Sequence, residues 1–338
     1  MRIIYTSLKE VIDKMNRTIK FLIFVSMSLS LYSCRNTTTK DDKDTIFVFK
    51  HEPSNAIYHW KTSFHPNRYE RNFICEHNVG RMYIRLFDVG VDNLYNGEGE
   101  QPVPIATTIF KDSLRSVVDV DIVPVVYITV EALRLNKPMC DKILKRVDDM
   151  CRAQKIVYNE VQLDCDWTKE TKPLFFELCR EARNKLHAKK KGLSATIRLH
   201  QLRDTLPDVD YGVLMLYNTE SLINPMVKNS ILNSSTIAEY MSYAKSDKHL
   251  DFAYPTYEWT LWFKNGKFKG ILPNGQELPQ DGELRHEQSN YEEIMKAKKN
   301  IKSSLVDIDY KSSTIIYHLD SANISKYSKD EIENIYRH

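Results

Sequence analysis

Apolar and polar positions alternate along the chain in short stretches that recur from residue 56 to residue 320. Short runs rich in β-branched and aromatic residues predict strands, and longer stretches with apolar residues three and four positions apart predict helices. The predicted strands are residues 56–64, 81–89, 122–130, 156–167, 193–200, 211–217, 250–257 and 313–320. The predicted helices are residues 67–78, 138–153, 170–190, 234–246, 290–302 and 328–336.

The order of these elements predicts the fold class. Strands that alternate with helices form parallel sheets joined by crossover helices. Eight such strands within residues 55–338 favour a single α/β domain, a (β/α)8 TIM barrel, over an open doubly wound sheet. No glycine-rich phosphate-binding motif follows any predicted strand, which disfavours the nucleotide-binding versions of open sheets.

A hairpin is predicted after the seventh strand. Residues 258–275 contain an Asn-Gly pair between aromatic runs, which is a strong hairpin signal, at a place where barrels carry substrate loops. Tyr257, Trp259 and Trp262 could present flat faces to sugar rings. Alternatively, part of this aromatic set closes a small core beneath the hairpin.

The most informative strand end is "VQLDCDWT", residues 161–168. Because side chains alternate along a strand, Gln162, Asp164, Asp166 and Thr168 share one face, which we expect to line the barrel. Two carboxylates roughly 7 Å apart would raise one of the two pKa values, which suits acid-base work near neutral pH. The alternative is a pair of structural acids neutralised by cations from neighbouring strands. The candidate cations are Arg85, Arg198 and Lys61.

Further candidates lie at other strand ends. Asp88 is a candidate for substrate binding, and Glu131 and Glu258 are candidates for a second catalytic carboxylate. A metal-assisted hydrolase is a further possible function, but no HxH or HExxH spacing supports it. We therefore predict neither a metal nor a cofactor. The acids and histidines that could converge in such a hydrolase are Asp88, Asp164, Asp166, His200 and His318.

Residues 161–168 resemble the fourth-strand signature of the chitinase-like glycoside hydrolases of family 18. Asp164 and Asp166 match the second and third acids of that signature, whereas Val161 replaces the first acid and Thr168 replaces the proton-donating Glu. The segment "LMLYN", residues 214–218, resembles the sixth-strand motif of the same family. Its Tyr217 matches the family's Tyr, and its Asn218 stands where Asp is expected.

The resemblance implies a glycan ligand and leaves two functions open. In the first, the protein hydrolyses a glycan with Asp164 or Asp166, and Glu131 or Glu258 supplies the missing acid. In the second, it is an altered barrel that binds a saccharide or a cell-envelope partner without turnover. Within the same resemblance, Trp259 could form the floor on which the sugar stacks.

Charge and cysteine usage narrow the partners. The formal net charge is +3, from 48 basic and 45 acidic residues. This small excess does not produce the strong positive electrostatic field that attracts nucleic acid, so we predict no nucleic-acid partner. Five cysteines beyond Cys34 are scattered without CxxC spacing, which argues against a disulfide scaffold or a zinc cluster.

The N-terminus predicts export and lipidation. Arg17 and Lys20 precede an apolar run that is too short to span a bilayer, and the run ends at Leu31-Tyr32-Ser33-Cys34. Residues 1–34 therefore read as a signal peptide with a bacterial lipobox, and either Met1 or Met15 could be the start. The alternative is an ordinary signal peptide that contains a cysteine.

The segment after Cys34 predicts how the barrel is attached. Residues 35–54 read as a flexible tether, because they begin with a polar and charged stretch. The layout resembles uncharacterised Bacteroidetes barrel lipoproteins. It predicts a place in the cell envelope, at the outer membrane, with the lipid as the only membrane contact.

We expect Cys34 to be acylated in the bacterial cell. Radiolabelled palmitate should enter the wild-type chain and should not enter Cys34→Ala, because the variant lacks the thiol that carries the lipid. Equal labelling of the two chains would contradict the lipobox prediction.

Overall fold

The computed structural model describes residues 47–93, 99–112, 120–244, 249–272, 279–305 and 311–337. The predicted signal peptide and Cys34 lie outside these residues. Within the described ranges, no helix is both long and apolar enough to cross a membrane.

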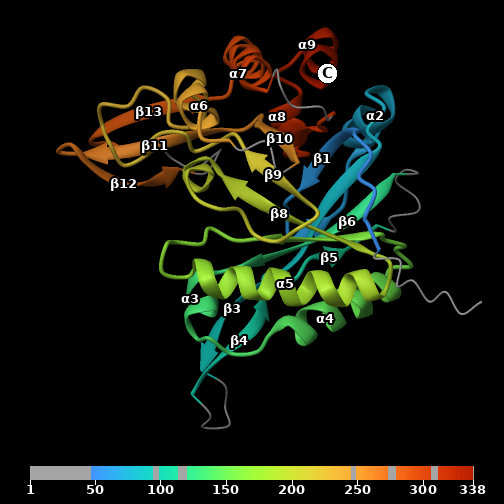
Figure 1. Cartoon of the computed structure of the whole chain (residues 1–338). Helices are drawn as coiled ribbons and strands as arrows, with labels where there is room; N and C mark the ends of the chain where they lie inside the picture. The colour runs from blue at the N-terminus through green and yellow to red at the C-terminus, as the bar shows by residue number, and fades with distance from the viewer. Residues whose placement is uncertain are drawn as a thin grey trace, which may run out of the picture. The chain divides into compact units, whose positions relative to one another are not determined.

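Eight parallel strands form a closed barrel (Figure 1). β1 pairs in parallel with both β14 and β3, so the sheet has no free edge at that point. The predicted (β/α)8 architecture is therefore confirmed, and each predicted strand corresponds to one barrel strand. The barrel strands are β1 (Asn55–His59), β3 (Arg81–Asn93), β6 (Asp121–Ile128), β7 (Glu160–Asp164), β8 (Gly192–Arg198), β9 (Tyr211–Met215), β10 (Leu250–Pro255) and β14 (Thr314–Tyr317).

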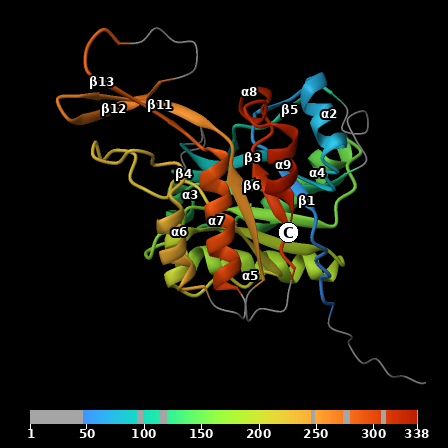
Figure 2. The ribbon, with the colours of Figure 1, turned by 90° about the horizontal axis from the view of Figure 1, so that it is seen from above.

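Helices surround the barrel (Figure 2). The six predicted helices are present with ends shifted by a few residues, as α2 (Arg68–Glu76), α4 (Cys140–Ala153), α5 (Lys172–Ala188), α6 (Ser234–Met241), α7 (Tyr291–Ser304) and α9 (Lys329–Tyr336). Three short elements were not predicted: α3 (Val130–Arg134), the 3-10 helix η2 (Leu199–Arg203) and α8 (Ser321–Ile324). They lie directly after barrel strands, where short apolar runs give a poor helical signal.

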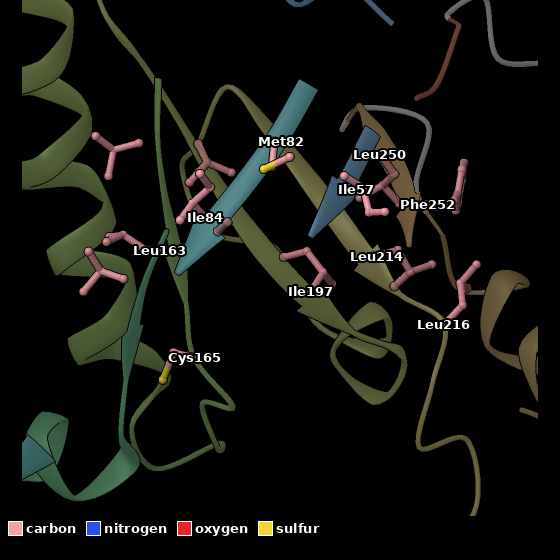
Figure 3. Close-up of a cluster of buried hydrophobic side chains, with 14 of the residues drawn as sticks. Ile57, Met82, Ile84, Leu163, Cys165, Ile197, Leu214, Leu216, Leu250 and Phe252 are labelled. Carbon is pink, nitrogen blue, oxygen red and sulfur yellow. The ribbon is translucent and has the colours of Figure 1, made fainter. Parts of the chain in front are cut away.

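The main hydrophobic core fills the space between the barrel and its helices. Figure 3 shows one part of it, where Leu163 and Cys165 of the β7 segment lie with Ile84 and Ile197 from other strands. Leu163 and Cys165 are fully buried. Trp167 belongs to the same core, so the face of residues 161–168 opposite the acids packs under the helices as predicted.

The barrel interior is partly polar. Glu160 is buried at the start of β7 and accepts a hydrogen bond of 2.6 Å from the hydroxyl of Tyr211. Gln162 accepts a bond of 2.6 Å from the hydroxyl of Tyr58 and donates one of 3.2 Å to Ser194. These buried side chains therefore satisfy one another, as buried polar groups must.

Three smaller groups of strands accompany the barrel. β4 (Glu100–Ile105) pairs antiparallel with the end of β3, and β2 (Ser63–Phe64) pairs with β5 (Ile109–Phe110). After β10, β11 (Glu258–Lys264) pairs antiparallel with β12 (Lys267–Leu272) and with β13 (Glu283–Gln288). Figures 1 and 2 show this three-stranded sheet projecting from the barrel. Residues 273–275 of the predicted hairpin lie outside the described residues.

Residues 47–54 pack against the strand starts of the barrel, although the sequence places them in the tether. A Cβ on Gly192, the first residue of β8, would come within 2.5 Å of the ring of Phe49, so any larger residue would have to displace that ring. Arg81, the first residue of β3, donates a bond of 3.0 Å to the carbonyl of Glu52. The packed part of the chain thus begins before residue 55.

Leu163→Ala should lower the free energy of unfolding by about 2–5 kcal/mol, because it removes a fully buried side chain from the core between β7 and the helices. Chemical denaturation monitored by circular dichroism measures this. The matched control is Leu284→Ala, since Leu284 on β13 is 41% exposed, and that change should stay within about 0.5 kcal/mol. Similar losses in both variants would contradict the assigned core.

Candidate functional site

Each barrel strand brings a charged or aromatic side chain to its carboxyl end, and we call this set the strand-end ring. The strand register aligns part of it, because Asp88 pairs with Tyr127 and Tyr127 pairs with Asp164 on neighbouring strands. Strand ends are where TIM barrels carry their functional residues. The strand-end ring consists of Trp60, Arg85, Asp88, Tyr127, Asp164, Asp166, Arg198, Tyr217, Tyr257 and Tyr317.

Asp164 is the buried acid of the ring. It ends β7 with its side chain only 1% exposed. It accepts hydrogen bonds from the hydroxyl of Thr196 and, at 3.1 Å, from Nη2 of Arg198. Burial raises the pKa of Asp164, Arg198 acts to lower it, and the nearby carboxylates of Asp166 and Asp88 raise it further.

Asp166 differs from Asp164 in its exposure. Its side chain is 50% exposed, and one carboxylate oxygen accepts a hydrogen bond from Nε of Arg198. Two residues of the same strand segment thus present one buried and one accessible carboxylate. Only Asp166 is open enough to meet a ligand hydroxyl directly.

Arg198 joins the two acids. It ends β8, where Ser194, Thr196 and Arg198 alternate toward the barrel interior as the acids do on β7. Its guanidinium bonds both Asp164 and Asp166 and donates a third bond of 3.2 Å to the hydroxyl of Tyr217. One cation therefore neutralises the acid pair and connects it to the aromatic side of the ring.

Of the three candidate cations, Arg198 pairs with the two acids, whereas Arg85 and Lys61 pair elsewhere. Arg85 forms a bidentate pair with Asp88, on its own strand. Lys61 pairs instead with Glu70 at 3.1 Å and with Asp320 at 2.7 Å, outside the strand-end ring.

Thr168 belongs to the start of a helix. Its hydroxyl lies 3.3 Å from the hydroxyl of Thr171, and its carbonyl accepts a bond of 2.8 Å from the backbone of Lys172 at the first residue of α5. Thr168 is exposed, and its hydroxyl is a far weaker acid than a carboxyl group. The position that the family signature fills with a proton donor therefore holds none.

Aromatic rings complete the strand-end ring. Tyr317, the last residue of β14, lies between Tyr217 and Trp60, with ring centroids 4.7 Å and 5.7 Å away. Tyr257 lies 6.0 Å from Tyr217 and donates a bond of 2.9 Å to the side chain of Asn218. Burial raises the pKa of Tyr217 to about 12, so its hydroxyl stays protonated near neutral pH.

The structure does not bring every candidate into the ring. Glu258 pairs with Lys326 at 2.7 Å, and Trp259 donates a bond of 2.7 Å to the buried carboxylate of Glu287. Trp262, on β11, donates to the carbonyl of Asp281, which lies just before β13. Glu131 is exposed in the first turn of α3 and makes no ion pair with any described residue. Gln162 lies two residues before Asp164 on the same face of β7 and is fully buried inside the barrel.

Several members of the ring were missed or misassigned from the sequence. Trp60, Tyr127 and Tyr317 fall within predicted strands without a predicted role, and the predicted strand 193–200 extends to His200. β8 ends at Arg198, and His200 lies in η2. Applying the alternation rule to this strand as it was applied to residues 161–168 would have placed Arg198 beside the acids.

The barrel resembles those of family 18 glycoside hydrolases. The GH18 chitinase ChiB from the chitin utilization locus of Flavobacterium johnsoniae aligns with a TM-score of 0.52 and 14% identity, over 85% of this chain and 94% of that chain. A class V chitinase from Nicotiana tobaccum, a glutamate-to-glutamine mutant in complex with NAG4, aligns with a TM-score of 0.53 and 12% identity, over 84% and 98%.

A third similar structure is that of a spore cortex-lytic enzyme. The spore cortex-lytic enzyme SleL of Bacillus megaterium QM B1551 aligns with a TM-score of 0.51 and 14% identity, over 79% of this chain and 71% of that chain. No protein-family model matches the chain, and no curated protein matches it. The comparisons therefore show a TIM barrel with the fold of GH18 chitinases.

Arg198→Gln should lower the free energy of unfolding by about 3–5 kcal/mol at pH 7.5, because it leaves the buried Asp164 without its cation. The loss should be smaller at pH 4.5. A carboxyl whose pKa is higher in the folded chain than in the unfolded chain binds its proton more tightly when folded, so stability falls as pH rises between the two values. Removing Arg198 raises the folded pKa of Asp164 and extends that window upward.

Denaturation curves at the two pH values measure the effect. The control is the double variant Arg198→Gln/Asp164→Asn, which removes the carboxylate as well and should recover most of the loss at pH 7.5. A double variant as unstable as Arg198→Gln would show that pairing with Asp164 is not the role of Arg198.

Proposed function

We propose that the strand-end ring binds a saccharide and does not hydrolyse it by the acid mechanism of family 18. The arrangement of Arg198 carries the proposal: one guanidinium bonds both signature acids, while the donor position holds Thr168. General acid catalysis needs a group with a pKa near the working pH, and it contributes on the order of 10²–10⁴-fold. This barrel keeps the polar arrangement, and the donor position of the signature holds no such group.

The buried acid does not supply the missing function. Its raised pKa would favour a protonated carboxyl, but Thr196 and Arg198 both donate to Asp164. A carboxylate that accepts from a cation and a hydroxyl is held as an acceptor. Asp164 therefore serves to position Arg198, and Arg198 in turn positions Asp166.

The chemistry of the ring suits a sugar. Pyranose rings have apolar faces that stack on aromatic side chains and hydroxyls that bond to charged groups. Trp60, Tyr217, Tyr257 and Tyr317 supply the aromatic faces beside Asp166 and Arg198. The similar structures include a chitinase in complex with NAG4, which makes β-linked N-acetylglucosamine oligomers the first ligands to test.

The proposed setting is the bacterial cell envelope, with the barrel carried on a tether from an acylated Cys34. The basis is the lipobox of the sequence and the polar segment after it. In such a setting, a glycan-binding barrel would meet polysaccharides of the envelope or of the surroundings.

Trp60→Ala should weaken the binding of an N-acetylglucosamine tetramer several-fold, because stacking on an aromatic ring contributes about 1 kcal/mol. Isothermal titration calorimetry measures the affinity for the tetramer. The same measurement is then made with a panel of envelope and host glycans. The matched control is Trp262→Ala, since Trp262 is also half-buried but lies on the three-stranded sheet and bonds to Asp281. The affinity of Trp262→Ala for the tetramer should equal that of the wild type.

A reducing-end assay on the same ligands separates binding from hydrolysis. We expect no release of reducing ends by the wild type or by Asp166→Asn, and a changed affinity in Asp166→Asn, because the exposed carboxylate contacts the ligand. Release by the wild type that Asp166→Asn abolishes would instead establish a hydrolase and overturn the proposal.

A further inference from the structure

A second cluster of polar side chains lies at the opposite end of the barrel from the strand-end ring. Asp251 is the second residue of β10, and His249 immediately precedes that strand. Leu250 and Phe252 point into the outer core (Figure 3), so the alternation of the strand turns Asp251 toward the barrel interior. His51 comes from the segment 47–54 that packs against the strand starts.

The three side chains converge on one point. Nε2 of His51 lies 2.8 Å from Oδ2 of Asp251, and Nε2 of His249 lies 3.3 Å from Oδ1. One ligand atom from each residue lies within 4.8 Å of the other two. The ring of His51 stacks on Tyr211 with centroids 3.8 Å apart, which fixes the direction of its nitrogen.

One atom of the cluster lacks the hydrogen bond that its burial demands. Asp251 is fully buried, and its Oδ1 accepts a bond of 2.7 Å from the backbone of Ser313. Its Oδ2 has no hydrogen-bond partner, so the contact of 2.8 Å with His51 has the length of a bond but not its angle. A buried oxygen without a partner is costly, and a cation bound beside Oδ2 would remove that cost. Nη1 of Arg81 lies 3.3 Å from Nδ1 of His51. Because arginine only donates, an ion on Nε2 requires this contact to be given up so that Nδ1 carries the proton.

We infer that His51, His249 and Asp251 bind a divalent transition-metal ion, with zinc as the best match. Two imidazoles and a carboxylate are common zinc ligands, whereas calcium and magnesium prefer oxygen ligands alone. A tetrahedral ion about 2.0–2.1 Å from each ligand separates the ligands by roughly 3.3 Å. The two observed contacts, 2.8 Å to Oδ2 and 3.3 Å to Oδ1, are made to different oxygens of Asp251, and one ligand atom from each residue lies within 4.8 Å of the other two. Side-chain movements within the cluster would therefore bring the three ligands to this geometry.

The chemistry also indicates what the ion does. His51 belongs to the N-terminal segment, and the other two ligands belong to β10, so a single ion ties that segment to the barrel. In the described part of the chain, this is the one group of histidines and acids with metal-ligand spacing. The set that the sequence suggested for a metal-assisted hydrolase does not form such a group there.

The test uses the whole mature chain, purified without a histidine tag and stripped with a chelator. Calorimetry with ZnCl₂ should show one site per chain, and CoCl₂ should give the visible absorption of tetrahedral cobalt. At about a hundredfold excess of zinc over Kd, Tm should rise by a few degrees, because the ion binds the folded chain. Absence of both a binding isotherm and a Tm shift would overturn the inference.

Variants assign the site. His51→Gln and His249→Gln should each raise the Kd for zinc by at least about tenfold, since loss of a direct ligand costs no less than loss of an outer-shell partner. The matched control is His65→Gln, because His65 also contacts a carboxylate, Asp112 at 3.0 Å, but at an exposed position. Equal affinities in all three variants would overturn the assignment.

Measuring Tm with and without zinc separates a metal site from a simple ion pair. If the cluster only pairs histidine with aspartate, His51→Gln lowers Tm by the same amount with and without zinc, and that result would overturn the inference. If the cluster binds zinc, the difference in Tm between His51→Gln and the wild type should grow on adding zinc. Circular dichroism of the metal-free variants checks that each is folded.

Discussion

The pairing of β1 with both β14 and β3 is the constraint on which the rest of the molecule depends. This short strand closes the sheet, so eight strands start at one end of a cylinder and finish at the other. Closure brings side chains that are as far apart in sequence as Trp60 and Tyr317 within 5.7 Å of each other. An open sheet would separate its two edge strands, and the strand-end ring could not exist.

Closure also imposes a cost, because the interior must be filled without leaving polar groups unpaired. The chain meets this demand with side chains that bond in layers: Glu160 with Tyr211, then Gln162 with Tyr58, then Asp164 with Arg198. Each layer rises by two residues along β7. The strand that carries the family-like signature, β7, thus also supplies polar side chains to each layer of the barrel interior. In the proposed function, the segment of β7 has two roles, because Asp164 positions Arg198 and Asp166 contacts the ligand.

The fold was predictable because its signals are local. Strand alternation and helical spacing are properties of neighbouring residues, and they located all eight barrel strands and six helices. The alternation also assigned Leu163 and Cys165 to the outer core. The elements that were missed, such as α3 and η2, are too short for their periodicity to be recognised.

The site was less predictable because its decisive contacts are long-range. Arg198 is 34 residues from Asp164, and the sequence offered three cations for the acids without a way to choose among them. Trp259 looked like a sugar platform, yet its indole bonds Glu287, a buried acid that no motif marks. The register between strands decides which polar groups pair. That register cannot be read from the local patterns of a single sequence.

The packing of residues 47–54 against the strand starts has a consequence for orientation. Because Phe49 fills the space over Gly192, the chain enters the folded domain at the pole opposite the strand-end ring. The first described residues and the strand-end ring therefore lie at opposite ends of the barrel. A ligand bound at the ring would leave the packing of residues 47–54 untouched, so the two ends of the barrel can be altered independently.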